Sequence, residues 1–111
     1  MTDCIFCRII AGEIPSAKVY EDEKMLVVKD VAPAAPVHVL LLPKVHYDNI
    51  MVADKDLVTY MLGKVEQLAA QLGIKEKGYR LVINTGKEGG QSVNHLHIHL
   101  IGGKELGWPP C

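Results

Sequence analysis

The sequence predicts an α+β domain in which about five strands form an antiparallel sheet. The chain has 111 residues, so residues 1–111 are expected to form a single domain around one core. Short strand patterns come in pairs separated by turns, and only one amphipathic pattern is long enough for a long helix. A parallel sheet would need more helical crossovers than this chain contains.

The first elements are a short helix and a hairpin. Residues 4–11 place apolar side chains on neighbouring helical faces, and Gly12 ends this helix because glycine readily adopts a left-handed conformation. The strand patterns 18–21 and 25–29 lie on either side of an acidic turn. This arrangement is typical of two short antiparallel strands.

A central strand and a long helix follow. The loop 31–36 contains two prolines and leads into residues 37–42, a run of β-branched residues and leucine that predicts a central strand. Asp54 is a suitable N-cap for a helix, and Gly73 is a suitable end. Steps of three and four residues place one apolar stripe on this helix, at Leu57, Met61, Val65, Leu68 and Leu72.

Two further strands complete the pattern. Residues 78–84 and 95–101 read as strands, and a loop with three glycines separates them. We also expect a two-fold homodimer. One sheet and one long helix would leave apolar side chains near Met61 and Val65 insufficiently covered.

The charge balance and the hydropathy exclude several classes of protein. Lys and Arg number 12 and Asp and Glu number 13, so no excess positive charge is available to hold a nucleic-acid backbone. The apolar run 37–42 is far shorter than the ~20 residues that span a bilayer. The first residues have neither the basic nor the long apolar stretch of a secretory signal. We therefore expect a cytoplasmic protein with no membrane association and no direct nucleic-acid binding.

The cysteines indicate a metal or redox site rather than a disulfide framework. Their number, three, is odd, and Cys4 and Cys7 have the Cys-x-x-Cys spacing. A thioredoxin-like redox role fits less well, because that motif belongs to a βαβ unit. Two buried thiols without a ligand remain the simpler alternative. Cys111 is expected to be an exposed thiol.

Three histidines alternate with apolar residues over residues 95–100. In a strand the three imidazoles would lie on one face, about 6.6 to 6.8 Å apart, with Leu96, Ile98 and Leu100 on the other face. His38 joins them if its strand is a neighbour. Such a cluster suits either a three-histidine zinc site that holds a hydroxide, or nucleophilic and acid–base catalysis by imidazoles.

The loop before these histidines suits an anionic oxygen such as that of a phosphoryl group. It offers backbone N–H groups and short polar side chains, from Asn84, Gly89, Gly90, Gln91 and Ser92. It is not a P-loop, because the pattern Gly-x-x-x-x-Gly-Lys-Ser/Thr is absent from the chain. The alternative is a polar hairpin connection that binds nothing.

Residues 89–103, Gly-Gly-Gln-Ser-Val-Asn-His-Leu-His-Ile-His-Leu-Ile-Gly-Gly, resemble the signature of the histidine-triad (HIT) superfamily. The segment Trp108-Pro109-Pro110 resembles the ending of its histidine triad nucleotide-binding (HINT) branch. Further matching segments are Ile14-Pro15-Ser16, Tyr20-Glu21-Asp22, Asp30-Val31-Ala32-Pro33, Ala35-Pro36-Val37-His38, Leu42-Pro43-Lys44 and Gly78-Tyr79-Arg80. The resemblance covers nearly the whole chain.

The resemblance implies a homodimeric HIT fold and an activity of the adenosine 5′-monophosphoramidase type. Such enzymes hydrolyse purine nucleoside 5′-phosphoramidates to the nucleoside monophosphate and an amine, and no organic cofactor is implied. At the matching positions His97 is the nucleophile that takes the nucleotidyl group. His99 and His38 lie beside the phosphate, and Ser92 lies near the leaving group.

The resemblance also implies the residues that bind the substrate. Phosphate oxygens are held by Asn84 and the backbone around Gly90, Gln91 and Ser92. Asp30 binds the ribose hydroxyls. The base pocket is lined by Ile5, Phe6, Ile9, Val31 and Leu40.

Some HIT proteins bind zinc through a Cys-x-x-Cys pair, the histidine after Pro-Lys and the first histidine of the triad. The same resemblance assigns these roles here to Cys4, Cys7, His46 and His95. Two sulfur and two nitrogen ligands suit a closed, structural zinc site.

Two alternatives to the phosphoramidase remain at this stage. One is a dinucleoside polyphosphate hydrolase, and the other is a nucleotide-binding interaction module with weak catalysis. The sequence identifies neither the leaving group nor the preferred purine.

Overall fold

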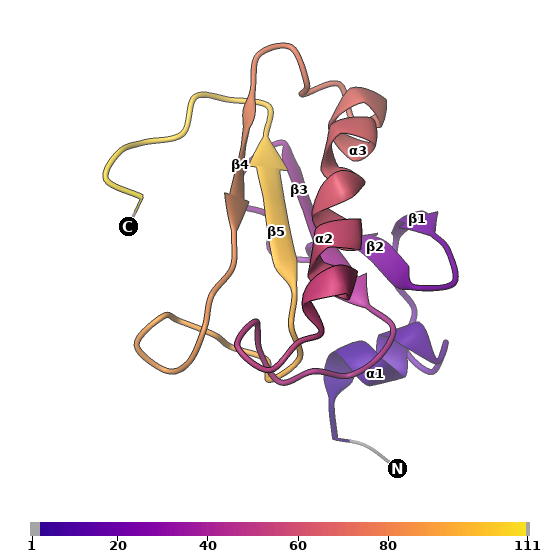
Figure 1. The fold of residues 1–111 in the computed structure, drawn as a ribbon. Coiled ribbons are helices and arrows are strands. Elements are labelled where there is room, and N and C mark those ends of the chain that lie inside the picture. Colours follow the sequence, from indigo (N-terminus) through magenta and orange to yellow (C-terminus); the bar gives the residue numbers. More distant parts are fainter. Residues whose placement is uncertain (1–2, 111) are drawn as a thin grey trace.

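Five antiparallel strands form one sheet in the order β1-β2-β3-β5-β4 (Figure 1). The structure is a computed structural model and describes residues 3–110, so Cys111 lies outside it. The strands are β1 (Lys18–Glu21), β2 (Met25–Lys29), β3 (Val37–Pro43), β4 (Tyr79–Val82) and β5 (Ile98–Gly102). The helices are α1 (Ile5–Ile10), α2 (Lys55–Gly63) and α3 (Val65–Gln71). The predicted α+β class and the five-stranded antiparallel sheet are confirmed.

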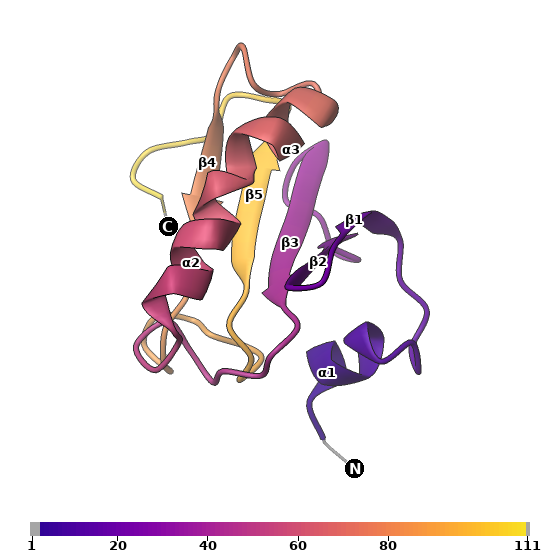
Figure 2. The ribbon, with the colours of Figure 1, turned by 45° about the vertical axis from the view of Figure 1, so that its right-hand side comes forward.

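The helices lie on opposite faces of the sheet. Helices α2 and α3 run across one face in front of β3 and β5, whereas α1 lies apart from them beside the lower part of the sheet (Figure 2). Side chains alternate along a strand. Leu41 of β3 therefore packs in the cluster with Leu68 of α3, while Leu40 packs in the cluster with Phe6 of α1.

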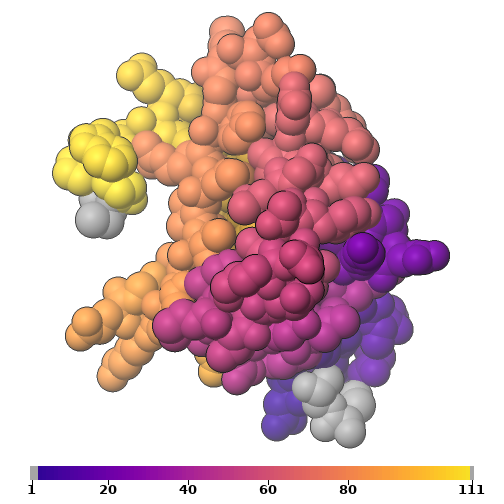
Figure 3. Space-filling model, in the orientation of Figure 1, coloured from indigo at the N-terminus to yellow at the C-terminus, as the bar shows by residue number. Residues whose placement is uncertain are grey.

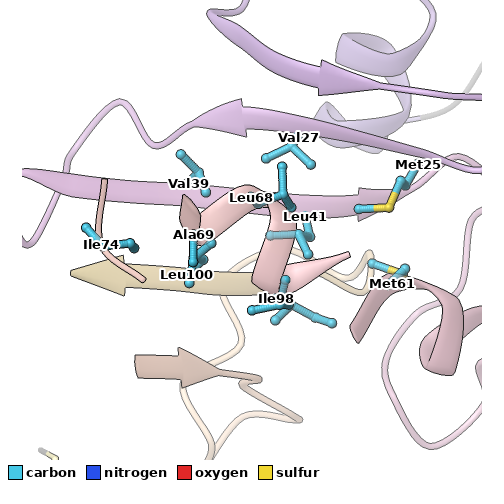
Figure 4. Packing of buried hydrophobic residues seen from close by; sticks show 11 residues of the cluster. Met25, Val27, Val39, Leu41, Met61, Leu68, Ala69, Ile74, Ile98 and Leu100 are labelled. Carbon is cyan, nitrogen blue, oxygen red and sulfur yellow. The ribbon is translucent and has the colours of Figure 1, made fainter. Parts of the chain in front are cut away.

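The larger core lies between the sheet and α2–α3. Figure 4 shows Leu68 of this helical layer among side chains from the strands, with Leu41 and Ile98 close to it. All three side chains are fully buried. The α2–α3 layer covers much of the sheet in the space-filling view, while the loop after β4 projects to one side (Figure 3).

The predicted long helix is divided at Lys64. Gly63 ends α2, and the Lys64 N–H bonds to the carbonyl of Met61, three residues back, at 3.1 Å. A glycine at this point weakens the helical backbone. The apolar stripe nevertheless continues across the break, because Met61, Val65 and Leu68 are all buried in the same core.

The strand predicted to begin at His95 begins instead at Ile98. The Leu96 N–H donates to the carbonyl of Tyr47 at 2.7 Å, so this part of the chain bonds to the loop after β3 rather than to a strand. Leu96 and Ile98 remain buried, as the alternation predicts. Only His99 of the three histidines lies within a strand.

The predicted reason for a dimer is wrong. Met61 is 0% exposed and Val65 is 4% exposed, because the sheet of the same chain covers them. The exposed apolar side chains lie elsewhere and include Tyr79 and Leu81 on the edge strand β4. Within residues 3–110, no helix is long and apolar enough to cross a membrane.

Candidate active site and metal centre

A cavity of about 490 Å³ lies on the face of the sheet that carries α1. Nine of the predicted substrate-binding residues line it: Ile5, Phe6, Ile9, Asp30, Val31, Leu40, Ser92, His97 and His99. Cavities of about 300 to 1,000 Å³ are typical of small-molecule sites. Here apolar side chains, a carboxylate, a hydroxyl and two imidazoles border the same space.

The cavity also has walls that sequence reasoning did not assign. These are Ile14, Pro15, Ser16, Ala17, Lys29 and Val93. Val28, whose position the family resemblance places near the base, also lines the cavity and lies on the same face of β2 as Leu26. No local pattern brings the segment 14–17 to this cavity, because that proximity depends on how the chain returns from α1 to β1.

His97 is held in one tautomer. Its Nδ1 lies 2.8 Å from the carbonyl oxygen of His95, and a carbonyl can only accept a hydrogen bond. Nδ1 therefore carries the proton, and Nε2 is the unprotonated nitrogen. The ring is 4% exposed and makes edge contacts with Phe6 and His99, at centroid distances of 5.0 and 5.1 Å. A neutral, oriented imidazole of this kind is a suitable nucleophile.

His38 and His99 form a second, connected pair. The antiparallel pairing of β3 with β5 confirms that the two strands are neighbours, and His38 Nε2 lies 2.9 Å from His99 Nδ1. Asp30 Oδ2 lies 3.3 Å from the same His38 nitrogen. Burial, together with the nearby His97 and His38, lowers the pKa of His99 to about 4, so this ring is neutral near pH 7.

Hydrogen bonds within the loop after β4, and one from the loop to Asp48, hold its conformation. The side-chain amide of Asn84 donates to the carbonyl of Gly89 at 2.8 Å. The Gln91 amide donates to the carbonyls of Asp48 and Val93, at 2.6 and 3.0 Å. The backbone N–H groups of Gly90 and Gln91 donate to carbonyls of the same loop. Asn84, Gly90 and Gln91 thus shape the loop beside the cavity, and Ser92 lines the cavity itself.

The four residues with predicted zinc roles come together. Cys4 caps α1, Cys7 lies in its first turn, His46 follows β3 and His95 precedes β5. Their candidate ligand atoms all lie within 4.8 Å of one another. Individual distances are 3.3 Å from Cys4 Sγ to His95 Nδ1, 3.2 Å from Cys7 Sγ to His46 Nδ1, and 3.1 Å between the two Nδ1 atoms. Zinc–ligand bonds of about 2.0 to 2.3 Å in a tetrahedron place neighbouring ligand atoms about 3.3 to 3.8 Å apart. The observed distances lie within or slightly below this range, so the cluster is close to the size that zinc requires.

The outer hydrogen bonds of both histidines also fit a metal. His95 Nε2 lies 2.9 Å from the carbonyl of Pro43, and His46 Nε2 lies 2.9 Å from Asp48 Oδ1. Each acceptor holds the ring proton on Nε2 and leaves the Nδ1 lone pair directed toward the sulfur atoms. Burial also lowers the pKa of His95, which favours the neutral form that a metal requires.

The alternative zinc site made of the three triad histidines does not form. His95 turns its free nitrogen toward Cys4 and Cys7, whereas His97 and His99 line the separate cavity. The triad is therefore divided between two centres. Phe6 lies between them, with its ring centroid 5.9 Å from that of His95 and 5.0 Å from that of His97.

Comparisons with known proteins find similar sequences and similar structures. The sequence profile of the HIT domain matches residues 11–106. The 14 kDa zinc-binding protein of Brassica juncea is 46% identical over 113 residues, which cover 97% of this chain and 99% of that protein.

Two crystal structures show the same fold. The HIT family hydrolase from Legionella pneumophila Philadelphia 1 superposes with a TM-score of 0.94 at 43% identity, covering 98% of this chain and all of the other. The histidine triad nucleotide-binding protein from Candida albicans has a TM-score of 0.88 at 37% identity, covering 96% of this chain and 83% of the other. The profile match, the relatives and the shared fold show that this chain belongs to the HIT domain family.

Proposed function

We propose that this protein hydrolyses purine nucleoside 5′-phosphoramidates through a nucleotidyl-histidine intermediate, as the HINT branch of the family does. The observation that carries the proposal is the tautomer of His97. Its Nδ1–H group donates a hydrogen bond to the carbonyl of His95, so Nε2 is the unprotonated nitrogen of the neutral ring. This ring lines a cavity large enough for a nucleotide. The family membership and the hydrolase neighbour support a hydrolytic reaction.

The proposed reaction has two steps. In the first, His97 Nε2 forms a bond to phosphorus, the P–N bond of the substrate breaks, and the leaving nitrogen takes up one proton from solvent to depart as the amine. In the second, water attacks phosphorus and returns one proton to solvent, the bond to His97 breaks, and the nucleoside monophosphate is released. His99 and Ser92 line the same cavity, where hydrogen bonds offset the charge that develops on the phosphate oxygens.

The rest of the cavity suits a purine nucleoside. Phe6, Ile9 and Leu40 offer apolar contacts for the base, and Asp30 offers a carboxylate for the ribose hydroxyls. Val31 lines the cavity although its side chain is wholly exposed, so a bound base would cover it. The Candida albicans neighbour is named a nucleotide-binding protein, which supports this assignment.

The test compares the wild type with His97→Asn. Adenosine and guanosine 5′-phosphoramidates are supplied together with a dinucleoside tetraphosphate, and the reaction is quenched for mass spectrometry. We expect phosphoramidate turnover, and a nucleotidyl adduct on the peptide that contains His97. His97→Asn should lose turnover and retain nucleotide binding, because asparagine keeps a polar side chain but no nucleophilic nitrogen.

Other outcomes of this test identify the alternatives. Faster cleavage of the dinucleoside tetraphosphate would indicate the polyphosphate hydrolase. Nucleotide binding without turnover of any of these substrates would indicate an interaction module. Near-normal turnover by His97→Asn, or an adduct on another residue, would refute the mechanism.

We also propose that Cys4, Cys7, His46 and His95 hold one structural zinc ion. Two thiols and two correctly oriented imidazoles leave no open position for a reacting water, so the metal stabilises the fold. The name of the Brassica juncea relative, a zinc-binding protein, supports this. Metal analysis should find about one zinc per chain, and replacement of both cysteines by serine should remove it.

We propose a two-fold homodimer that uses the edge strand β4. An edge strand presents unpaired backbone groups, and here Tyr79 and Leu81 add exposed apolar side chains, at 39% and 38% exposure. Light scattering at micromolar concentration should return about twice the monomer mass. Leu81→Lys should favour the monomer, and a 12.2 kDa wild type would contradict the proposal.

A further inference from the structure

The ring of His38 receives a hydrogen bond from the backbone. The Ala34 N–H lies 3.0 Å from His38 Nδ1. Ala34 belongs to the two-proline loop and is exposed, whereas His38 is buried with 9% exposure. Because a backbone N–H can only donate, Nδ1 of His38 must be the unprotonated nitrogen. The single proton of the neutral ring is then on Nε2.

We propose that the Ala34 N–H sets the direction of the His38–His99 hydrogen bond, so that His99 presents an N–H group to the phosphate-binding part of the cavity. This inference rests on the proposed function for the identity of the ligand. His38 Nε2–H donates to His99 Nδ1, 2.9 Å away. His99 Nδ1 is therefore an acceptor, its proton is on Nε2, and the ring lines the cavity. Ala34 acts as a positioning residue through its backbone.

The direction matters because His99 is neutral. Its pKa is lowered to about 4 by burial and by the neighbouring His97 and His38, so near pH 7 the ring has one proton and two possible tautomers. With the hydrogen bond reversed, His99 would turn a lone pair toward the phosphate oxygens. In the direction that the Ala34 N–H sets, it would turn a donor toward them, and a donor stabilises the charge that develops during phosphoryl transfer.

The contact also separates the two histidine clusters by chemistry. Asp30, His38 and His99 have ligand atoms within 4.8 Å of one another, close enough for a divalent cation. A cation there would need the lone pair of His38 Nε2, and with Nδ1 already an acceptor the ring would have to lose its only proton. In the zinc cluster the outer partners of His46 and His95 accept hydrogen bonds and leave both Nδ1 lone pairs available. The backbone therefore keeps metal out of the catalytic pair.

The test measures ring tautomers directly. Two-bond ¹H–¹⁵N correlation spectra of the full chain, loaded with one equivalent of zinc, distinguish Nδ1–H from Nε2–H for each histidine. We expect the Nε2–H form for His38 and His99. Two variants remove the Ala34 N–H: Ala34→Pro, and a backbone ester with lactic acid in place of Ala34, which changes only N–H to O. Ala34→Gly keeps the donor and is the matched control.

In both variants without the N–H, His38 should lose its single tautomer, and kcat should fall about tenfold to a hundredfold with KM changed less than about threefold. A second equivalent of zinc should then shift the His38 and His99 signals, which it should not do in the wild type or in Ala34→Gly. Ala32→Pro removes the neighbouring N–H, which donates to Asp30 Oδ1 at 2.8 Å, and should leave the His38 tautomer unchanged. The ester keeps the test decisive if either proline variant fails to fold.

An Nδ1–H form of His38 or His99 in the wild type would overturn the inference, as would an unchanged His38 tautomer in the ester variant. These outcomes do not depend on turnover. If the wild type hydrolyses no phosphoramidate but the tautomers are as expected, the proposed function fails and the role of Ala34 stands. If turnover occurs with the wrong tautomers, only the role of Ala34 fails.

Discussion

Asp48 gives the sharpest test of the metal centre, because its side chain touches the cluster without being a candidate ligand. Its Oδ1 accepts the His46 Nε2–H at 2.9 Å, and 70% of the side chain is exposed. Removing such an outer partner usually weakens metal binding about tenfold to a hundredfold. The high exposure places Asp48 at the lower end of this range, since water can replace the lost acceptor. We therefore expect about tenfold weaker zinc binding for Asp48→Ala.

A tenfold weaker affinity corresponds to about 1.4 kcal/mol of lost stabilisation when zinc is saturating. The unfolding entropy of a 111-residue chain is about 0.23 kcal/mol/K, so the melting temperature with zinc should fall by about 6 °C. Without zinc, the variant and the wild type should melt within about 2 °C of each other, because an exposed surface substitution alone usually changes the unfolding free energy by no more than about 0.5 kcal/mol. With zinc, the melting temperature of Asp48→Asn should lie between those of Asp48→Ala and the wild type, since the asparagine amide oxygen can still accept the hydrogen bond.

The assay is competition with a chelator for zinc affinity, together with thermal unfolding with and without zinc. Glu23→Ala is the control, because this residue is an exposed acid in the β1–β2 turn and is not the outer hydrogen-bond partner of either histidine, which are Asp48 and Pro43. Equal zinc affinities for Asp48→Ala and the wild type would refute the argument from the outer hydrogen bond. An equal loss of zinc affinity in Glu23→Ala would show that the net charge of the protein, and not the outer hydrogen bond, controls zinc binding. If zinc did not raise the melting temperature of the wild type, the structural role of the metal would be wrong.

Two further predictions concern a partly buried acid and a glycine. Partial burial alone would raise the pKa of Asp22, but hydrogen bonds from the Tyr60 hydroxyl, the Tyr20 hydroxyl and two backbone N–H groups outweigh it and lower this pKa to about 2. The stability that Asp22 contributes is then present above the unfolded pKa of about 4 and is lost as the pH falls toward 2. The urea midpoints at pH 7 and pH 3 should therefore differ less in Asp22→Asn than in the wild type. An equal difference in the two proteins would contradict this. A Cβ on Gly89 would lie 2.3 Å from the Thr85 carbonyl oxygen, so Gly89→Ala should displace the loop before Ser92 and lower kcat/KM about tenfold to a hundredfold. Gly63→Ala, where the added Cβ meets nothing within 4 Å, is the matched control, and equal activity of both variants would contradict the role of the loop.

Local patterns predicted most of the fold. The hairpin follows from two strand patterns around an acidic turn, the central strand from a run of β-branched residues and leucine, and the apolar stripe from Leu57 to Leu72 from steps of three and four residues. All three signals depend only on near neighbours in the chain. The break at Lys64 and the late start of β5 at Ile98 were missed. Both depend on hydrogen bonds that compete with the local pattern, and one of these bonds comes from Tyr47, far away in the sequence.

The candidate site shows the same division. The sequence by itself determined which residue types were available, since the alternating histidines and the Cys-x-x-Cys pair were visible without a structure. Residue types and spacing alone left open how the triad is used, and the family resemblance implied that His95 joins the cysteines while His97 and His99 serve the phosphate. The tertiary structure has this division, with His95 turned to the cysteines and His97 and His99 lining the cavity. It alone decided each tautomer, because the partners are the carbonyls of Pro43 and His95 and the N–H of Ala34, backbone groups whose positions depend on the fold. Side-chain chemistry is encoded residue by residue, whereas the direction of a hydrogen bond depends on which groups the folded chain brings within about 3 Å.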